Sequence, residues 1–123
     1  METKDIEKTL DTPIYNFSAV IGDTTVYYHV MKMDQSLFFW IGTSLTMDDM
    51  AVAIGNRDSN DGPPVACKII GDMTDMTQTN LALKLCKRTG KQSFVSYNVP
   101  EEVMPDLVQK RLIEEMVDHP EKF

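Results

Sequence analysis

The stretch "SLFFWIG", residues 36–42, is apolar at each position between its first serine and its last glycine. A strand with one wet face alternates apolar and polar side chains, whereas this run has apolar residues for both faces. It therefore predicts a strand that is covered on both sides. The dipeptide "DQ" at 34–35 offers a chain reversal just before it.

The rest of the chain supplies further strands and two helices. Strands are predicted at 14–21, 24–33, 49–54, 65–70 and 91–99. Helices are predicted at 78–89 and 105–118, where apolar residues recur at helical spacing and Gly90 and Pro120 follow as stop signals. The sum is an α+β fold: a mostly antiparallel, six-stranded, meander-type sheet with two helices from the C-terminal half packed on it. Residues 1–12 are predicted to be a flexible leader and 13–123 a single domain.

Composition narrows the functional class. The 123-residue chain carries a formal charge of −7, which argues against a nucleic-acid binder. No apolar run approaches the roughly 20 residues that span a bilayer, so no membrane contact is expected. The two cysteines, Cys67 and Cys86, are too few for a disulfide framework and are predicted to be reduced core thiols. Reduced thiols suit a cytoplasmic location, with the nucleus as a second one.

The loop "GDMTDMTQTN", residues 71–80, resembles an ion or phosphate site at first sight. It has too few carboxylates for a calcium loop and lacks the second glycine and the lysine of a phosphate loop. Asp75 and Gln78 have the spacing of a capping box, and Asp72 lies near the same helix start. We therefore predict that the loop initiates a helix, with contact to a partner as a second role and no metal or cofactor.

No catalytic pattern is evident. His29 and His119 are the only histidines, and neither belongs to a recognisable nucleophile–histidine pattern. Ser96 lacks the glycine elbow of a hydrolase nucleophile. A small hydrolase that uses Ser96 with His29 or His119 is kept as the least favoured alternative.

Adaptable and charged side chains favour a binding protein instead. Nine methionines are present, and six of them fall near predicted strand ends or loops: Met31, Met33, Met47, Met50, Met73 and Met76. Methionine is common at surfaces that accept a partner. The positive residues Lys84, Lys87, Arg88 and Lys91 form a cluster without an acid among them. The cluster is either a solvated helix end or a docking patch for an acidic protein.

Several short stretches together resemble the proteasome assembly chaperone 4 family. They are "YNFSA" (15–19), "SLFFWIG" (36–42), "LAL" (81–83), "GKQSFVSYN" (90–98), "RLIEEM" (111–116) and "PEKF" (120–123), and the "GDMTD" loop matches in place. The resemblance implies a non-catalytic α+β chaperone without a cofactor. It implies a heterodimer with the related assembly chaperone 3, formed through the β-sheets. It also implies binding to proteasome α subunits, especially around α5, while the seven-membered α ring assembles.

Partner contact is predicted at ten residues: Tyr28, Val30, Trp40, Asp72, Met73, Asp75, Met76, Lys84, Lys87 and Arg88. Other assembly chaperones insert a C-terminal tail of the pattern hydrophobic–Tyr–any residue into pockets of the α ring. This sequence ends "EKF", without that tyrosine, so that docking mode is not carried over. An adaptor or scaffold domain of another complex is the second alternative, and it predicts homodimers.

Overall fold

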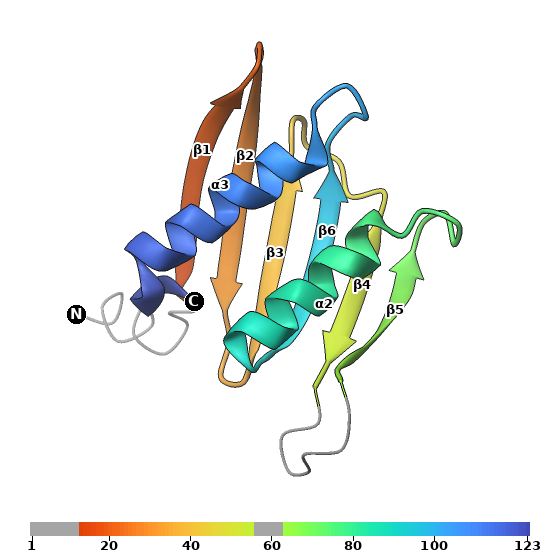
Figure 1. The fold of residues 1–123 in the computed structure, drawn as a ribbon, viewed down its shortest axis with the longest axis vertical. Coiled ribbons are helices and arrows are strands. Elements are labelled where there is room, and N and C mark those ends of the chain that lie inside the picture. Colours follow the sequence, from red (N-terminus) through yellow and green to blue (C-terminus); the bar gives the residue numbers. More distant parts are fainter. Residues whose placement is uncertain (1–12, 56–62) are drawn as a thin grey trace, which may run out of the picture.

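The computed structural model describes residues 13–55 and 63–123, which form one six-stranded sheet with two helices on one of its faces (Figure 1). The predicted leader at 1–12 lies outside the described residues, as do residues 56–62 between two of the predicted strands. The strands are β1 (Ile14–Ile21), β2 (Thr24–Lys32), β3 (Ser36–Gly42), β4 (Met50–Ile54), β5 (Val65–Ile70) and β6 (Gln92–Asn98). The predicted strand bounds agree with these to within a residue or two.

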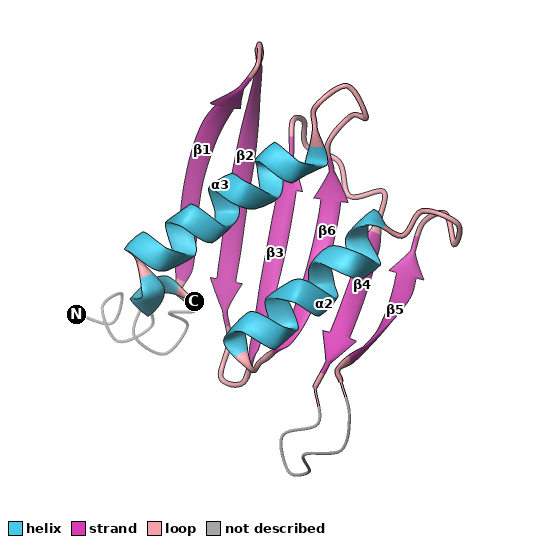
Figure 2. Cartoon of the chain, in the orientation of Figure 1, coloured by secondary structure: helices cyan, strands magenta, loops and turns pink. Residues whose placement is uncertain are grey.

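The sheet has the strand order β1-β2-β3-β6-β4-β5. All neighbouring pairs are antiparallel except β3 and β6, which run parallel (Figure 2). The predicted α+β class with a mostly antiparallel six-stranded sheet is confirmed. The meander itself holds only for β1 to β3, because β6 returns into the middle of the sheet after a helical crossover. A parallel pair needs such a long connection.

The two helices are α2 (Thr77–Thr89) and α3 (Pro105–Asp118), and a short 3₁₀ turn, η1 (Pro120–Lys122), follows. Gly90 ends α2 in the left-handed conformation with φ of +70°, as its sequence position predicts. Pro105 occupies the first turn of α3, where its missing N–H costs nothing.

The core lies between the helices and the sheet. The strands contribute alternate residues, with Val26, Tyr28 and Val30 from β2 fully or almost fully buried. Leu81 and Leu85 from α2 and Val108 and Leu112 from α3 belong to the same buried cluster. The apolar sides of the helices and of the sheet therefore pack together in one layer. Burial of these side chains is the main source of stability.

One buried carboxylate ties α3 to the edge strand β1. Glu115 is 6 % exposed, accepts a hydrogen bond from the Tyr15 hydroxyl, and pairs with Arg111 at 2.7 Å. Burial alone would raise the pKa of Glu115, but the hydrogen bonds from Tyr15 and Arg111 and the Arg111 charge lower it below its ordinary value. The hydrogen bond between Tyr15 and Glu115 thus fastens α3 to β1, the edge strand that lies farthest from α2.

Replacing Glu115 by Gln should lower the free energy of unfolding at pH 7 by about 1–3 kcal/mol, because the charged acceptor of two hydrogen bonds is lost. Since the folded pKa is lowered, the contribution is present above the unfolded value of 4.5 and is lost as the pH falls through the folded value. Urea unfolding between pH 7 and pH 3 measures both effects. Glu114→Gln, at an exposed neighbouring position, is the control; equal losses for the two variants would contradict the assignment.

Candidate partner-binding face

The sheet face turned away from the helices carries no charged side chain within the described strands. Because successive strand residues point to opposite faces, the register assigns every Asp, Glu, Lys and Arg of these strands to the helix side. The only such residues are Lys32 and Lys68, whose amino groups bond to Glu121 and Gln78 on that side. The chain as a whole has 12 basic and 19 acidic residues, so a face without any of them is unusual. We call this surface the open face.

A row of apolar residues crosses all six strands of the open face. Successive register pairs place its members side by side: Ile14, Met31, Phe38, Phe94, Val52 and Cys67. The motif-based prediction did not include this row. Its sequence signal is the lack of charge at alternate positions of every strand, which becomes visible only when the strands are aligned in register.

Further apolar side chains on the open face are left exposed by the chain itself. Val20 and Val65 are 72 % and 71 % exposed, and Tyr27, Ile54 and Ile69 are about half exposed. Scattered exposed apolar residues are normal, but a continuous apolar sheet face marks an interaction surface. The sequence predicted that the β3 stretch is covered on both sides. Within the described residues the helices cover only one of them (Figure 1).

Trp40 lies flat along the open face and is held there on two sides. Its indole N–H donates to the carbonyl oxygen of Thr46 at 2.8 Å, and its ring lies 5.2 Å from the His29 ring. A Cβ at Gly42 would lie 2.7 Å from the Trp40 ring, so only glycine leaves room for this orientation. Trp40 is 9 % exposed, and with Tyr27 and Leu45 it lines a shallow apolar hollow.

Two predicted contact residues are core residues, which corrects the prediction for them. Tyr28 and Val30 point toward the helices and are 0 % and 1 % exposed. The Tyr28 hydroxyl donates to the carbonyl oxygen of Val108 in α3 at 2.9 Å. The neighbouring positions Tyr27, His29 and Met31 are the ones that face outward, because a shift of one residue along a strand changes the face.

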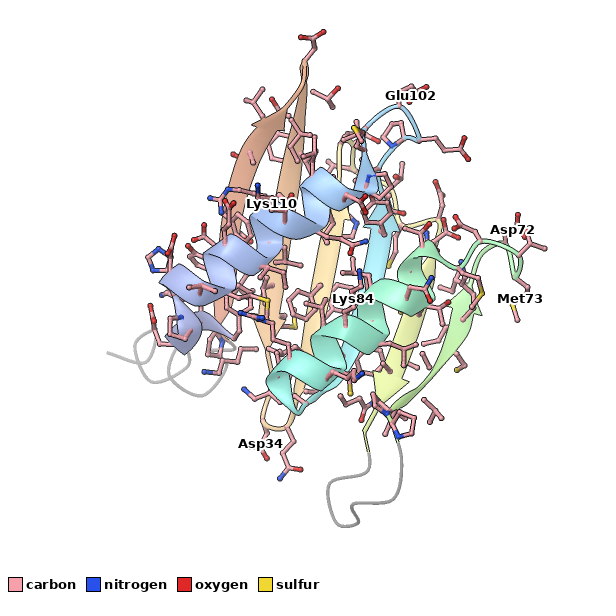
Figure 3. The ribbon with its side chains drawn as sticks, viewed as in Figure 1. Asp34, Asp72, Met73, Lys84, Glu102 and Lys110 are labelled. Atoms are coloured by element: carbon pink, nitrogen blue, oxygen red, sulfur yellow. The ribbon has the colours of Figure 1, made fainter. Side chains whose placement is uncertain are left out.

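The loop before α2 presents two methionines and uses its two acids locally. Met73 and Met76 are exposed, and Figure 3 shows Met73 and Asp72 at the margin of the sheet. Asp72 accepts hydrogen bonds from the backbone N–H and hydroxyl of Thr74, and Asp75 accepts one from the backbone N–H of Thr77 at 3.0 Å. These bonds lower the pKa of both carboxyls.

The predicted role of Asp75 at the helix start is therefore seen, but the reciprocal capping box is not. Gln78 is buried instead, where its side chain accepts a hydrogen bond from Lys68 and donates one to the Tyr97 carbonyl oxygen. Met76 occupies the N-cap position and provides no side-chain cap.

The predicted basic residues lie on the outer side of α2, away from the open face. Lys84, Lys87 and Arg88 are exposed there, and Figure 3 shows Lys84 on α2. The Lys84 amino group donates to the Gln109 side chain of α3 at 3.1 Å. Lys87 and Arg88 occupy the last turn, where positive charge complements the helix dipole. Contact with a partner at these residues, at the loop residues and at Trp40 stays a prediction.

The residues of the hydrolase alternative do not converge. Ser96 is fully buried and donates to the carbonyl oxygen of Asp49 at 2.6 Å. Trp40 lies between Ser96 and His29 in the sheet register, a separation of two strand spacings, or about 10 Å. His119 lies at the end of α3 on the opposite face, beside Glu115. Neither histidine is therefore placed to act as a base for Ser96.

The prediction that both cysteines are core thiols is confirmed for one of them and wrong for the other. Cys86 is buried in the core as predicted, whereas the prediction for Cys67 is wrong: it is exposed on the open face of β5, an edge strand. In residues 13–55 and 63–123, no three His, Cys, Asp or Glu side chains are grouped to hold a metal ion. No helix in the same part of the chain has the length and apolarity to cross a membrane.

The described chain is an α+β domain in which two helices back one face of a six-stranded sheet and the strands of the other face carry no charged residue. The family model of proteasome assembly chaperone 4 matches residues 25–99. Human proteasome assembly chaperone 4 is 41 % identical over 115 residues, which is 92 % of each chain. The mouse protein of the same name is 39 % identical over 125 residues and the full length of both chains. The chain belongs to the proteasome assembly chaperone 4 family.

A solved structure supports the fold independently of sequence. A chain of a novel chaperone complex for yeast 20S proteasome assembly superposes with a TM-score of 0.54. The match covers 89 % of this chain and 96 % of that chain, at 15 % identity. At that identity the likeness concerns the fold.

Replacing Gly42 by Ala should displace the Trp40 indole, because the added methyl group would lie within 2.7 Å of the ring. We expect a loss of about 1–3 kcal/mol in the free energy of unfolding and a changed tryptophan emission maximum. Trp40→Ala removes the obstacle, so adding Gly42→Ala to that variant should cost little. Additive losses in this double-mutant cycle would contradict the packing described.

Proposed function

We propose that this protein is a non-catalytic chaperone for assembly of the proteasome core-particle α ring. In this proposal it acts as a heterodimer with an assembly chaperone 3-like protein and binds α subunits around α5. The observation that carries the proposal is the charge-free open face. Membership of the assembly chaperone family supports it, as does the likeness in fold to a chain of a yeast chaperone complex.

The open face fits a second sheet better than a small ligand. Two sheets pack face to face about 10 Å apart, with their inner side chains interdigitating. The cross-strand row from Ile14 to Cys67 runs the width of the sheet and could fill such a layer. Obligate interfaces of this type bury roughly 2,000 Å² or more and lack charge at their centre. A sister protein with a similar sheet would complete the cover that the β3 sequence predicts.

The helix side remains free in such a heterodimer. Lys84, Lys87 and Arg88 on α2 then face outward, and the methionines of the loop before α2 stay accessible at the sheet margin. Exposed charge pairs contribute only about 0.2–1 kcal/mol each. Contacts of that strength suit an α subunit that has to be released as the ring is completed.

Tyr27→Asp tests the dimer, because it places an unpaired charge on the open face, within the proposed interface. We expect the affinity for the assembly chaperone 3-like protein to fall at least about a hundredfold, since a buried unpaired charge costs several kcal/mol. Val117→Asp is the matched control: Val117 is also exposed and apolar, but it lies on α3. Isothermal titration calorimetry gives the affinities, and circular dichroism confirms that both variants are folded.

Two outcomes would contradict the dimer. Unchanged affinity for Tyr27→Asp would remove the open face as the interface. A wild-type chain that pairs with itself and ignores the sister protein would favour the adaptor alternative, which predicts homodimers.

Charge reversal on α2 tests the second contact. Lys87→Glu combined with Arg88→Glu should weaken capture of the α5 subunit by about tenfold at physiological salt, from two exposed contacts, and leave the heterodimer intact. Lys110→Glu, an exposed lysine on α3, is the control. Equal loss of capture from the control would show that net charge rather than this patch matters, and no loss from the double variant would rule out the patch as a contact.

A further inference from the structure

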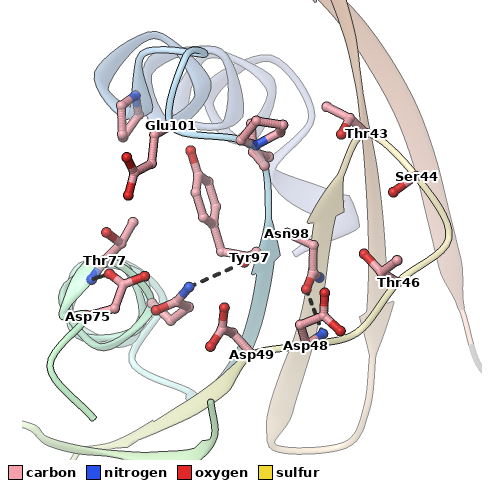
Figure 4. A pocket seen from close by; sticks show the side chains of 14 residues that line it. Thr43, Ser44, Thr46, Asp48, Asp49, Asp75, Thr77, Tyr97, Asn98 and Glu101 are labelled. Carbon is pink, nitrogen blue, oxygen red and sulfur yellow. Dashed lines mark hydrogen bonds between the residues drawn. The ribbon is translucent and has the colours of Figure 1, made fainter. Parts of the chain in front are cut away.

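An acidic pocket lies at the end of the sheet where α2 and α3 begin, away from the centre of the open face. Its volume is about 330 Å³, at the lower end of the range for ligand pockets. Four carboxylates line it, from Asp48, Asp49, Asp75 and Glu101, and no lysine, arginine or histidine does (Figure 4). We call it the end pocket.

One polar group in the end pocket has no partner. Tyr97 is 95 % buried, at 5 % exposure, and its hydroxyl is the only buried side-chain N or O atom among the described residues that lacks a hydrogen bond. Figure 4 shows the side chain reaching from β6 into the space bordered by Glu101 and Thr77. Burial is the main cause that raises the pKa of Tyr97 to about 12, and the negative charge of Asp75 is the second. The hydroxyl therefore stays protonated, and its oxygen can accept a hydrogen bond.

The carboxylates of the pocket are only partly neutralised. Asp75 is bonded to the first amide of α2, and Asp49 lies 3.8 Å from the Lys68 amino group. Within the described residues, no hydrogen bond or ion pair engages the side chains of Asp48 and Glu101. Each helix start contributes about half a positive charge, which is well below the four negative ones. The pocket is therefore negative and excludes an anion.

We infer that the end pocket binds the side chain of a lysine or arginine that a partner protein inserts, with the Tyr97 hydroxyl and the carboxylate of Glu101 as its acceptors. A metal ion is a poorer fit, because no three of the acids are grouped closely enough to hold one. An elongated cation with several N–H groups reaches separated acceptors. The inference does not depend on the heterodimer, because the pocket lies within a single chain.

The test uses small probes and the full chain. Nα-acetyl-lysine methylamide, Nα-acetyl-arginine methylamide and the uncharged Nα-acetyl-norleucine methylamide are titrated while backbone amide shifts are recorded by NMR. We expect saturable shifts with the two cationic probes at Thr77, Tyr97, Asn98 and Glu101, and none with norleucine. Shifts that are absent, or spread evenly over the acidic surface, would overturn the inference.

Matched variants separate the pocket from general acidity. Glu101→Gln should weaken binding of the cationic probes about two- to fivefold, as for a partly exposed ion pair. Glu102→Gln should have no effect, because the neighbouring Glu102 does not line the pocket. Equal effects of the two variants would reduce the binding to long-range charge and overturn the inference.

Tyr97→Phe separates binding from stability. Removing a buried hydroxyl without a partner should leave the melting temperature unchanged or raise it, because the desolvation penalty disappears. Probe binding should weaken about tenfold, because the charged ligand loses an acceptor. A lowered melting temperature with unchanged binding would mean that the hydroxyl serves the fold, and the inference would fail.

Discussion

Both faces of the sheet carry apolar residues, the two helices of the described residues cover only one of these faces, and the rest of the structure follows from this constraint. Both helices pack on the same face, where the buried residues of β2, β3 and β6 meet Leu81, Leu85, Val108 and Leu112. The other face carries no charged residue in the described strands. Covering exposed apolar side chains of this face with a second surface would be favourable in water.

The arrangement gives the two sides of the molecule different chemistry. The open face carries an apolar row across all six strands and no charged residue within the described strands, and it suits a long-lived interface with a similar sheet. The helix side and the loop before α2 are charged or rich in exposed methionine, and they suit contacts that form and break readily. In the proposed function, the open face would hold the permanent partner, and the helix side and the loop would hold the partner that is released.

The sequence predicts the positions of the helices and strands well. It predicts less well which face of the sheet each strand residue occupies. Strong period-2 and helical patterns, with Gly90 and Pro120 as boundary signals, place each described strand and helix within a few residues. The insertion of β6 beside β3 was missed, because strand order depends on long-range pairing. Tyr28 and Val30 were assigned to a partner although they face the helices, and Cys67 was assigned to the core although it faces outward. A single strand does not reveal which of its faces the helices occupy. The end pocket was missed because its acids come from three separate segments of the chain.

Alkylation of Cys67 tests the central claim most directly, because this thiol lies on the open face and Cys86, buried in the core, is an internal reference. The rate of reaction with iodoacetamide is measured for the chain alone and for its complex with the assembly chaperone 3-like protein. The account predicts ready modification of Cys67 in the free chain, strong protection in the complex, and an unreactive Cys86 in both. An unchanged Cys67 rate in a stable one-to-one complex would contradict it.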